Sequence, residues 1–392
     1  MGFSLPFHLS VQEVQNALTL AMKLFERRMN RICINTGKAP VQKMATTMKD
    51  IARELGVSII TVSKVLRNHE DISAKTRQRV LDKVQEMNYT PNLAARSLVT
   101  GRTYLVGLVV PDLLHTFFAQ IAKSLSTALL KKGYCLTIST SDEDAEMEER
   151  TVNRLLARRL DALVIASAAT SSPTLERILH EGPPLVLVDR RFPALKANYV
   201  GIDDEAVGQM ATEHLIEIGC KRIAHLRGPD TSGGRGRLSG YLKALASHGM
   251  TAPPEYISAQ GPADVHSIES GELLTRQLLS LKSRPDGIFT FNDPLGIGAI
   301  HAIRDAGLHV PEDIAVVGAG NLYYNEELRI PLTSIDQQTE ETGEQTAKLV
   351  LSLLESKTPP PVRSLIVAPK LVVRASTQRE NKQTHTAKPH GR

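Results

Sequence analysis

The chain has 392 residues, of which 42% are hydrophobic and 23% charged, and its formal net charge is +5. This length suits two or three structural units, and the composition is that of a soluble protein with a sizeable core. No stretch reaches the roughly 18 uninterrupted apolar residues that a membrane span requires, so we expect no transmembrane segment.

The three cysteines, Cys33, Cys135 and Cys220, are far apart in the sequence. Their spacing fits neither a disulfide framework nor a metal site, and it favours a reducing cytoplasm. We expect Cys135 and Cys220 to pack as small apolar groups.

Residues 1–43 are the least informative part of the chain. An amphipathic helix over 11–32 is one interpretation, with apolar residues on one side: Leu18, Met22, Phe25 and Met29. Such a helix could lie on a membrane surface. The order of features in a secretion signal is absent. We favour a disordered extension or a start codon assigned too far upstream.

Residues 48–68 predict two short helices joined by a tight turn. Their apolar residues recur at helical spacing and predict one shared core: Ile51, Ala52, Leu55, Val62, Val65 and Leu66. Gly56 stands where the first helix must end, because a residue without Cβ adopts the left-handed conformation at little cost. Ser58 can accept a hydrogen bond from the free N–H groups of the second helix. This pattern predicts a helix-turn-helix, whose second helix enters the DNA major groove.

A third helix is predicted over 73–88, with Ser73 as its N-cap. Apolar residues at spacings of four and three face the first two helices: Val80, Val84 and Met87. Basic residues outnumber acidic ones between residues 44 and 103. That excess suits phosphate contact and salt-dependent binding.

From Tyr104 onward the pattern changes to alternating strands and helices. Strand-like apolar runs occur at 104–110, 134–139, 162–166, 185–189, 222–226, 287–291 and 314–318. Amphipathic helical stretches, such as 118–132 and 206–218, separate most of them. Repeated units of this kind predict parallel sheets with helices on both faces. The pattern is too long for one unit, and the turns after Asp203 and near 333–337 are expected to pass between two lobes.

Several motifs resemble the lactose-repressor (LacI/GalR) family of bacterial transcription regulators. They are Ala52-Arg-Glu-Leu-Gly-Val-Ser58, Thr61-Val-Ser63, Ser73-Ala-Lys-Thr76 and Asn88-Tyr-Thr-Pro-Asn92. The resemblance implies a small all-α helix-turn-helix head and a two-lobed α/β core with parallel sheets, like that of periplasmic binding proteins. In this family the head begins close to the initiator, and both Met44 and Met48 lie just ahead of it.

The implied function is a sequence-specific transcription regulator, most often a repressor. It would bind a pseudo-palindromic double-stranded operator as a homodimer, with a tetramer left open. A small molecule between the lobes, with a carbohydrate or derivative as the candidate, would control it allosterically in the cytoplasm. No enzyme activity, catalytic residue, cofactor, metal or membrane partner is expected.

The predicted segments are an extension at 1–43, the DNA-binding head at 44–91, a hinge helix or linker at 92–102, the effector-binding core at 103–376 and a disordered basic tail at 377–392.

The candidate DNA-contacting residues follow from the resemblance: Ile59, Ile60, Thr61, Ser63, Lys64, Tyr89, Asn92, Ala95 and Leu98. Ile59 and Ile60 stand where relatives often place polar base-readers. Their apolar side chains can contact thymine methyl groups but cannot form bidentate hydrogen bonds. Lys64 can reach a guanine edge or a phosphate, whereas Thr61 and Ser63 suit phosphate oxygens. Leu98 matches a leucine that wedges into a base step, with Ala95 beside it. Without DNA we expect this segment to be a plain linker.

The resemblance implies these effector-binding residues: Phe117, Phe118, Asp189, Arg237, Asn292, Asp293 and Gln337. Ligands bind beyond the carboxyl ends of strands in open parallel sheets, and Asp189, Asn292 and Asp293 also follow predicted strand ends. The glycine-rich segment 228–241 lacks the Gly-Lys-Ser/Thr of a P-loop. It resembles the family's loop whose last arginine, here Arg237, binds the effector through its planar guanidinium. The phenylalanines suit stacking on a sugar or a base. The Asp and amide positions suit structural roles equally well.

One departure concerns the strand that ends at Gly318. Many sugar-responsive relatives carry a carboxylate where this chain has Gly320. Either Asn321 takes over part of that work or the effector is not a simple neutral sugar.

Other functions remain as alternatives. A solute-binding protein of a transporter would need export and would have no use for residues 48–98. An enzyme would need a nucleophile elbow, a metal cluster or a paired acid and base, whereas the histidines are scattered: His115, His225, His266 and His301. A regulator whose co-effector is another protein is the third alternative.

Overall fold

The computed structural model describes residues 46–66, 69–90, 97, 101–114, 116–169, 173–192, 195–258, 268–356, 358 and 360–379. The chain divides into two compact units, of which the first ends at Asn92 and the second begins at Leu93. Our predictions for residues 1–43, Asn92, Ala95 and Leu98 lie outside the described residues. Within the described part of the chain, no helix has the length and apolar character needed to cross a membrane.

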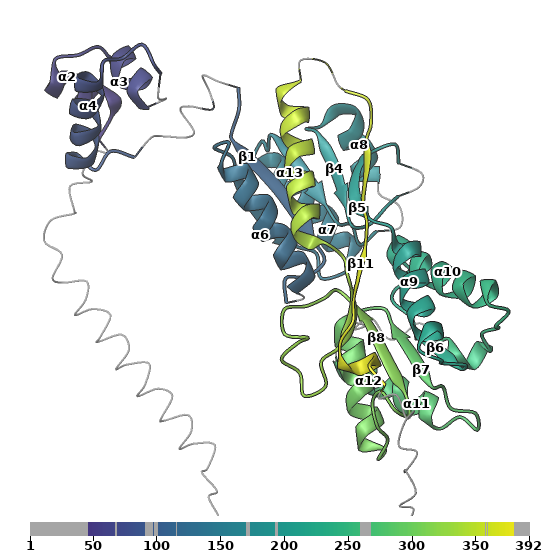
Figure 1. The fold of residues 1–392 in the computed structure, drawn as a ribbon. Coiled ribbons are helices and arrows are strands. Elements are labelled where there is room, and N and C mark those ends of the chain that lie inside the picture. The colour runs from purple at the N-terminus through teal and green to yellow at the C-terminus, as the bar shows by residue number, and fades with distance from the viewer. Residues whose placement is uncertain are drawn as a thin grey trace, which may run out of the picture. The chain divides into compact units, whose positions relative to one another are not determined.

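The first unit is the predicted three-helix head, with α2 (Met48–Leu55), α3 (Ile59–Leu66) and α4 (Ala74–Glu86) (Figure 1). Gly56 ends α2 with φ at 65°, a conformation open to a residue without Cβ. The Ser58 hydroxyl accepts from the Thr61 N–H at 3.0 Å and caps α3. Ser73 caps α4 in the same way. The buried residues form one core, as predicted: Ile51, Ala52, Val62, Val65 and Val80.

The first lobe of the second unit is built on a six-stranded parallel sheet in the order β10-β5-β4-β3-β1-β2. Its strands are β1 (Leu105–Val110), β2 (Cys135–Thr140), β3 (Ala162–Ile165), β4 (Leu185–Val188), β5 (Asn198–Ile202) and β10 (Ser364–Val367). Helices α6 (Thr116–Leu130) and α13 (Thr339–Glu355) bury their apolar sides on one face. Helices α7 (Ala145–Ala157) and α8 (Pro173–Glu181) cover the other.

The second lobe is a five-stranded sheet in the order β11-β9-β8-β7-β6. Its strands are β6 (Ile223–Leu226), β7 (Gly287–Thr290), β8 (Ala315–Ala319), β9 (Thr333–Asp336) and β11 (Lys370–Val372), of which only β11 is antiparallel to its neighbour. Helices α9 (Asp204–Glu217) and α10 (Ser232–Ser247) share one core with this sheet. Helices α11 (Ile268–Leu279) and α12 (Asp293–Asp305) share the other.

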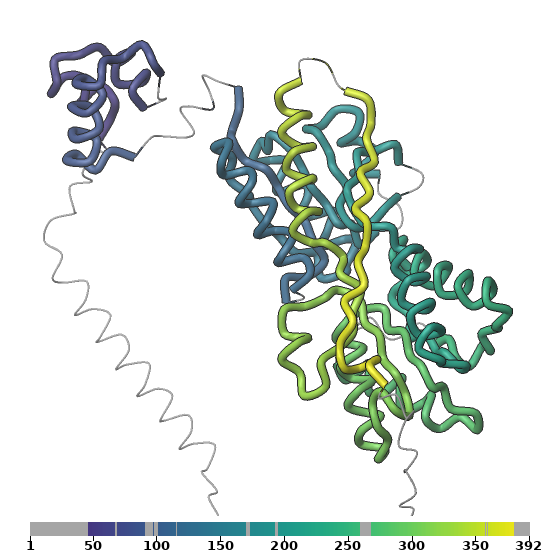
Figure 2. Tube along the Cα trace, viewed as in Figure 1, coloured from purple at the N-terminus to yellow at the C-terminus, as the bar shows by residue number. Residues whose placement is uncertain are grey.

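The chain passes between the lobes three times, and Figure 2 shows the last passage as a yellow segment that runs along both. The passages join β5 to α9, β9 to α13, and β10 to β11. The first two lie at the predicted turns near Asp203 and 333–337. The third was missed because β10 and β11 are mostly exposed or half-buried.

Two sequence predictions are wrong. The predicted tail begins too early, because Thr377 is buried in a short 3₁₀ helix (Ala375–Thr377). The Arg379 guanidinium also donates to the backbone carbonyls of Pro311 at 3.0 Å and Asp286 at 2.9 Å. Cys135 is exposed, since it starts the edge strand β2. Cys220 is buried, as expected.

Candidate functional site

A small cavity of about 40 Å³ lies between the two lobes, at the carboxyl ends of their strands. Its walls are Phe117, Phe118, Asp189, Arg190, Thr231, Gly233, Arg237, Phe291, Asn292 and Gln337. Six of the seven predicted effector-binding residues are thus brought together. Ligand pockets usually measure roughly 300–1,000 Å³. The cavity in this arrangement of the lobes is therefore smaller than a sugar-sized molecule requires.

Arg237 is the central cation of the cavity and is almost fully buried. Its Nε donates to the Asp204 carboxylate at 3.0 Å, and its Nη2 donates to the Gln337 amide oxygen at 2.8 Å. Its Nη1 donates to the Phe291 backbone carbonyl, and its Cζ lies 4.3 Å from the centre of the Phe291 ring. These three partners, one on each nitrogen, engage three of the five N–H groups and fix the orientation of the guanidinium.

Glycines allow α10 to bring Arg237 to this position. An added Cβ at Gly240 would lie 2.0 Å from the Glu205 backbone oxygen, and one at Gly208 would lie 2.0 Å from the Arg237 backbone oxygen. Only residues without a side chain permit α9 and α10 to approach so closely. Asp204, at the start of α9, thereby reaches the guanidinium.

Asp189 supplies a carboxylate from the end of β4, where its backbone has φ at 64°. Burial, together with the neighbouring Asp204 carboxylate, raises the pKa of Asp189 to about 6. The Arg190 Nε lies 4.0 Å from this carboxylate, too far for a hydrogen bond. The terminal nitrogens of Arg190 instead form a bidentate pair with Glu143 at 2.6 and 2.7 Å. The Asp189 carboxylate can therefore accept a hydrogen bond from a ligand.

Asn292 lines the cavity and also caps α12, since its side-chain oxygen accepts from the Leu295 N–H at 3.1 Å. Asp293, in contrast to the prediction, is not among the residues that line the cavity. Its buried carboxylate accepts from the Ser334 hydroxyl at 2.6 Å and from the Leu322 N–H at 2.9 Å. One step along a helix turns a side chain by about 100°, which directs Asp293 into the lobe.

Asp293 also explains the unusual Gly320. A Cβ at Gly320 would lie 2.9 Å from the Asp293 carboxylate, and the φ of 136° at this position is accessible mainly to glycine. Asn321 does not take over the missing carboxylate's work. Its amide donates to Asp336 at 3.1 Å and accepts from Arg374 at 2.7 Å, away from the cavity.

Four lining residues were missed from the sequence: Arg190, Thr231, Gly233 and Phe291. Arg190 and Phe291 directly adjoin predicted residues, and the Thr231 hydroxyl caps α10 at the Gly234 N–H. The only sequence signal for these four residues was their position next to or shortly after a predicted strand end. That signal did not indicate which of several adjacent side chains would face the cavity.

In the head, the predicted DNA-contacting residues of α3 lie on its solvent side. Ile59 and Ile60 are 41% and 67% exposed. Thr61 shares the Ser58 cap through a 2.9 Å hydroxyl contact. Lys64 forms a surface ion pair with Asp71. Ser63 is half-buried, and Tyr89 packs against the hydrophobic core of the head.

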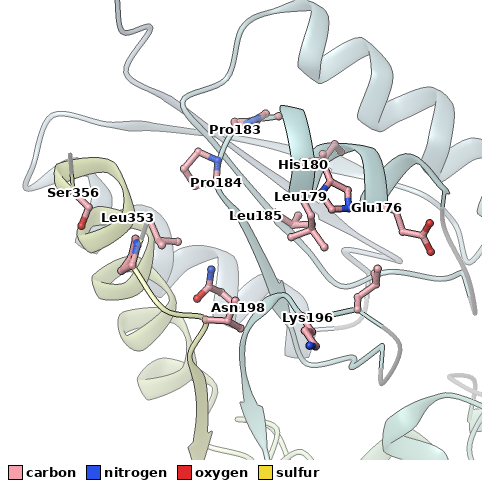
Figure 3. A pocket seen from close by; sticks show the side chains of 15 residues that line it. Glu176, Leu179, His180, Pro183, Pro184, Leu185, Lys196, Asn198, Leu353 and Ser356 are labelled. Carbon is pink, nitrogen blue, oxygen red and sulfur yellow. The ribbon is translucent and has the colours of Figure 1, made fainter. Parts of the chain in front are cut away.

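A wider surface hollow of about 810 Å³ lies in the first lobe between α8, α13 and the beginnings of β4 and β5 (Figure 3). Leu179, Leu185 and Leu353 form part of its apolar wall, and Lys196 lies on its rim. It lies at the amino ends of the strands, opposite the end where ligands bind in such sheets. The described residues contain no cluster of three or more His, Cys, Asp or Glu side chains suited to a metal ion.

Two family models match the chain: "Bacterial regulatory proteins, lacI family" over residues 47–92 and "Periplasmic binding protein-like domain" over residues 212–377. The HTH-type transcriptional regulator DegA of Bacillus subtilis is 33% identical over 338 residues, which cover 85% of this chain and 98% of DegA.

Two solved structures are similar over most of the chain. The complex of the transcriptional regulator CelR with cellobiose is 31% identical with a TM-score of 0.64, covering 84% of this chain and 99% of that one. The Lac repressor dimer bound to operator and the anti-inducer ONPF is 27% identical with a TM-score of 0.73, covering 86% and 100%.

Proposed function

Because the chain belongs to the lacI family of bacterial regulatory proteins, we propose that it represses transcription as a dimer on a pseudo-palindromic operator. A small molecule held between the lobes controls this binding. The observation that carries the proposal is the combination, in one chain, of a helix-turn-helix head with an inter-lobe cavity built around Arg237. A solute-binding protein of a transporter would have no use for such a head.

The head supports a sequence-specific role because α3 leaves its solvent side free of core contacts. This helix lies in the major groove in helix-turn-helix proteins. Exposed basic side chains of the same head, among them Lys49 and Lys75, can contact phosphates and make affinity salt-dependent. The site of action is then the bacterial nucleoid in the cytoplasm.

The cavity supports a hydroxyl-rich effector, with a carbohydrate or derivative as the candidate. The Asp189 carboxylate lines the cavity and supplies the acceptor that neither Gly320 nor Asn321 provides. The cations Arg190 and Arg237 are each paired with a carboxylate, from Glu143 and Asp204. Asp189 adds a further acceptor, so an anionic ligand would meet no uncompensated cation. The rings of Phe117, Phe118 and Phe291 suit the apolar face of a sugar. Cellobiose occupies the related regulator CelR.

Dimerisation is supported by exposed apolar side chains on the first lobe. Leu114 follows β1, Leu130 ends α6, and Ile138 lies on the edge strand β2. Large exposed apolar groups of this kind favour a protein interface. We propose a second copy of the chain as the partner, with further pairing of dimers as the next possible level.

The effector controls DNA binding because its affinity differs between the arrangements of the two lobes. An effector that binds one separation of the lobes better than another shifts the population toward it. In a dimer that shift changes the spacing of the two segments 92–102 that lead to the heads, and thus the affinity for DNA. A protein co-effector that binds the core would act through the same lobes.

The test is operator affinity measured at several salt concentrations, with and without a panel of sugars that includes cellobiose and ribose. Arg237→Ala should leave DNA binding intact and abolish the effector response. Arg235→Ala is the matched control, because this arginine lies on the same helix but forms a surface pair with Asp230 at 3.0 Å. A retained response in the Arg237 variant would refute the effector site.

A further inference from the structure

The ion pair between Arg190 and Glu143 spans the carboxyl edge of the first sheet. Arg190 follows the end of β4, whereas Glu143 lies in the turn between β2 and α7. In the order β4-β3-β1-β2 these strands are three spacings apart, or about 14 Å. The two long side chains nevertheless meet, because Nη1 and Nη2 of Arg190 donate to the two Glu143 oxygens at 2.7 and 2.6 Å. Glu143 therefore engages both terminal nitrogens of the guanidinium.

A nearer carboxylate forms no hydrogen bond with this guanidinium. Asp189 directly precedes Arg190, and its carboxylate lies 4.0 Å from the Arg190 Nε. An N–H···O hydrogen bond requires about 2.7–3.2 Å, so the Nε would have to move by only about 1 Å to form one. Asp189 and Arg190 both line the cavity between the lobes, whereas Glu143 is not among the lining residues. The pair with Glu143 thus holds Arg190 back from an acceptor that faces the cavity.

Two other charged groups act on the Asp189 carboxylate, and they pair with each other. The Arg237 Nε donates to the Asp204 carboxylate at 3.0 Å. A further carboxylate, that of Glu148, acts on Arg190, but it accepts from a hydroxyl and a backbone N–H at the end of β3. Arg190 is therefore the cation whose position decides whether Asp189 is paired.

We propose that Glu143 is a positioning residue for the effector, because it holds Arg190 away from Asp189 and keeps that carboxylate available to hydroxyl groups of the ligand. The inference rests on the proposed function and adds a residue outside the cavity that determines which acceptor the cavity offers. When Glu143 loses its charge, Arg190 pairs with Asp189 instead. The ligand then loses a charged acceptor, which forms stronger hydrogen bonds than a neutral one.

The arrangement is tested first without a ligand. Glu143→Gln keeps the length of the side chain but removes the charge that holds Arg190. Because burial raises the pKa of Asp189 to about 6, Asp189→Asn should raise the urea midpoint of the parent chain at pH 7.5. In the Glu143→Gln background the new pair with Arg190 should lower the pKa of Asp189, and this gain should be lost. A purely structural role of Glu143 would lower both midpoints and leave the gain between them unchanged.

Asp142→Asn is the matched control for the loss of one negative charge. Asp142 lies in the same turn, is exposed and has φ at 50°, a conformation that asparagine tolerates. This change leaves the pair between Glu143 and Arg190 in place. The gain from Asp189→Asn should therefore persist in the Asp142→Asn background.

The second arm measures the effector response. For a sugar of the panel, such as cellobiose or ribose, that alters operator affinity, Glu143→Gln should raise the concentration needed for half of the effect about tenfold. Adding Arg190→Gln removes the cation that would occupy Asp189, so the double variant should recover part of this loss. General damage to the fold would not be repaired by a second substitution.

Three results would overturn the inference. The gain from Asp189→Asn could persist in the Glu143→Gln background, which would show that Arg190 stays in place or moves to Glu148. An active sugar could act on Glu143→Gln at the same concentration as on the parent chain, or the double variant could respond no better than Glu143→Gln. A panel without an active sugar would instead refute the proposed effector control, and the urea comparison would still decide whether Glu143 positions Arg190.

Discussion

The raised pKa of Asp189 gives a prediction about stability. The pKa lies at about 6 in the folded chain against an ordinary value of 3.8 for an aspartate, because burial and Asp204 disfavour the charged carboxylate. The folded state therefore holds this proton more tightly than the unfolded state between those two values. Stability must fall as pH rises from about 4 to about 6, and the loss is complete above pH 7.

The magnitude follows from the size of the shift. About two pKa units correspond to roughly 3 kcal/mol of unfolding free energy at neutral pH. Asp189→Asn removes the charge and keeps the shape, and asparagine tolerates the positive φ of this position. The variant should therefore be more stable than the parent chain at pH 7.5, by at most this amount, and no more stable at pH 4.

The assay is urea-induced unfolding of the second unit in both proteins across this pH range. Other titrating groups cancel in the difference between the two curves. Asp305→Asn serves as the control, because Asp305 is an exposed carboxylate paired with Arg276 at 3.1 Å, and such surface pairs contribute little. A difference between Asp189→Asn and the parent that is constant with pH would refute the reasoning.

Three further predictions concern other parts of the chain. Gly240→Ala should lower the unfolding free energy by about 1–3 kcal/mol, because the new methyl group would collide with the Glu205 backbone oxygen. Thermal unfolding measures this loss, and unchanged stability would contradict the close packing of α9 against α10. Asp71→Asn should release Lys64 from its ion pair and strengthen DNA binding a few-fold, most at low salt. Fluorescence anisotropy measures the affinity, and weaker binding would show instead that the ion pair orders the lysine for DNA. Cys135→Ser should remove one fast-reacting thiol equivalent in a titration with a thiol reagent, and an unchanged count would contradict the exposure of this residue.

Local signals were sufficient to predict the head. Gly56, Ser58 and Ser73 each act on backbone groups within four residues, so their roles can be inferred without tertiary structure. The spacing of apolar residues then identifies one apolar side on each of α2, α3 and α4, and these three sides pack together in a single core.

Seven of the eleven described strands were predicted from their apolar runs. The seven apolar runs match β1, β2, β3, β4, β6, β7 and β8 within one residue or two. The missed strands β5, β9, β10 and β11 have three to five residues each. Length does not explain the omission, because the predicted strands β3, β4, β6 and β7 have only four residues each. The positions of the missed strands depend on pairing with distant segments.

The cavity shows the same division between local and long-range information. A glycine-rich segment indicated Arg237, but its partner Gln337 is 100 residues away and could not be inferred as a contact. Asp293 was placed wrongly because the rotation of α12 depends on packing against Ser334 and Leu322. Asp189 was placed correctly because it directly follows a buried strand.

The three passages between the lobes restrict the motions that are available to the core. The last passage leaves only residues 368 and 369 between β10 and β11, and one of them is Pro369. Sliding of one lobe along the other would have to stretch three short tethers at once, whereas rotation about an axis through them bends each one slightly. Effector binding is thus expected to rotate one lobe relative to the other about this axis. A small angular change at the cavity becomes a larger displacement at the far end of the first lobe, where the segment from the head enters.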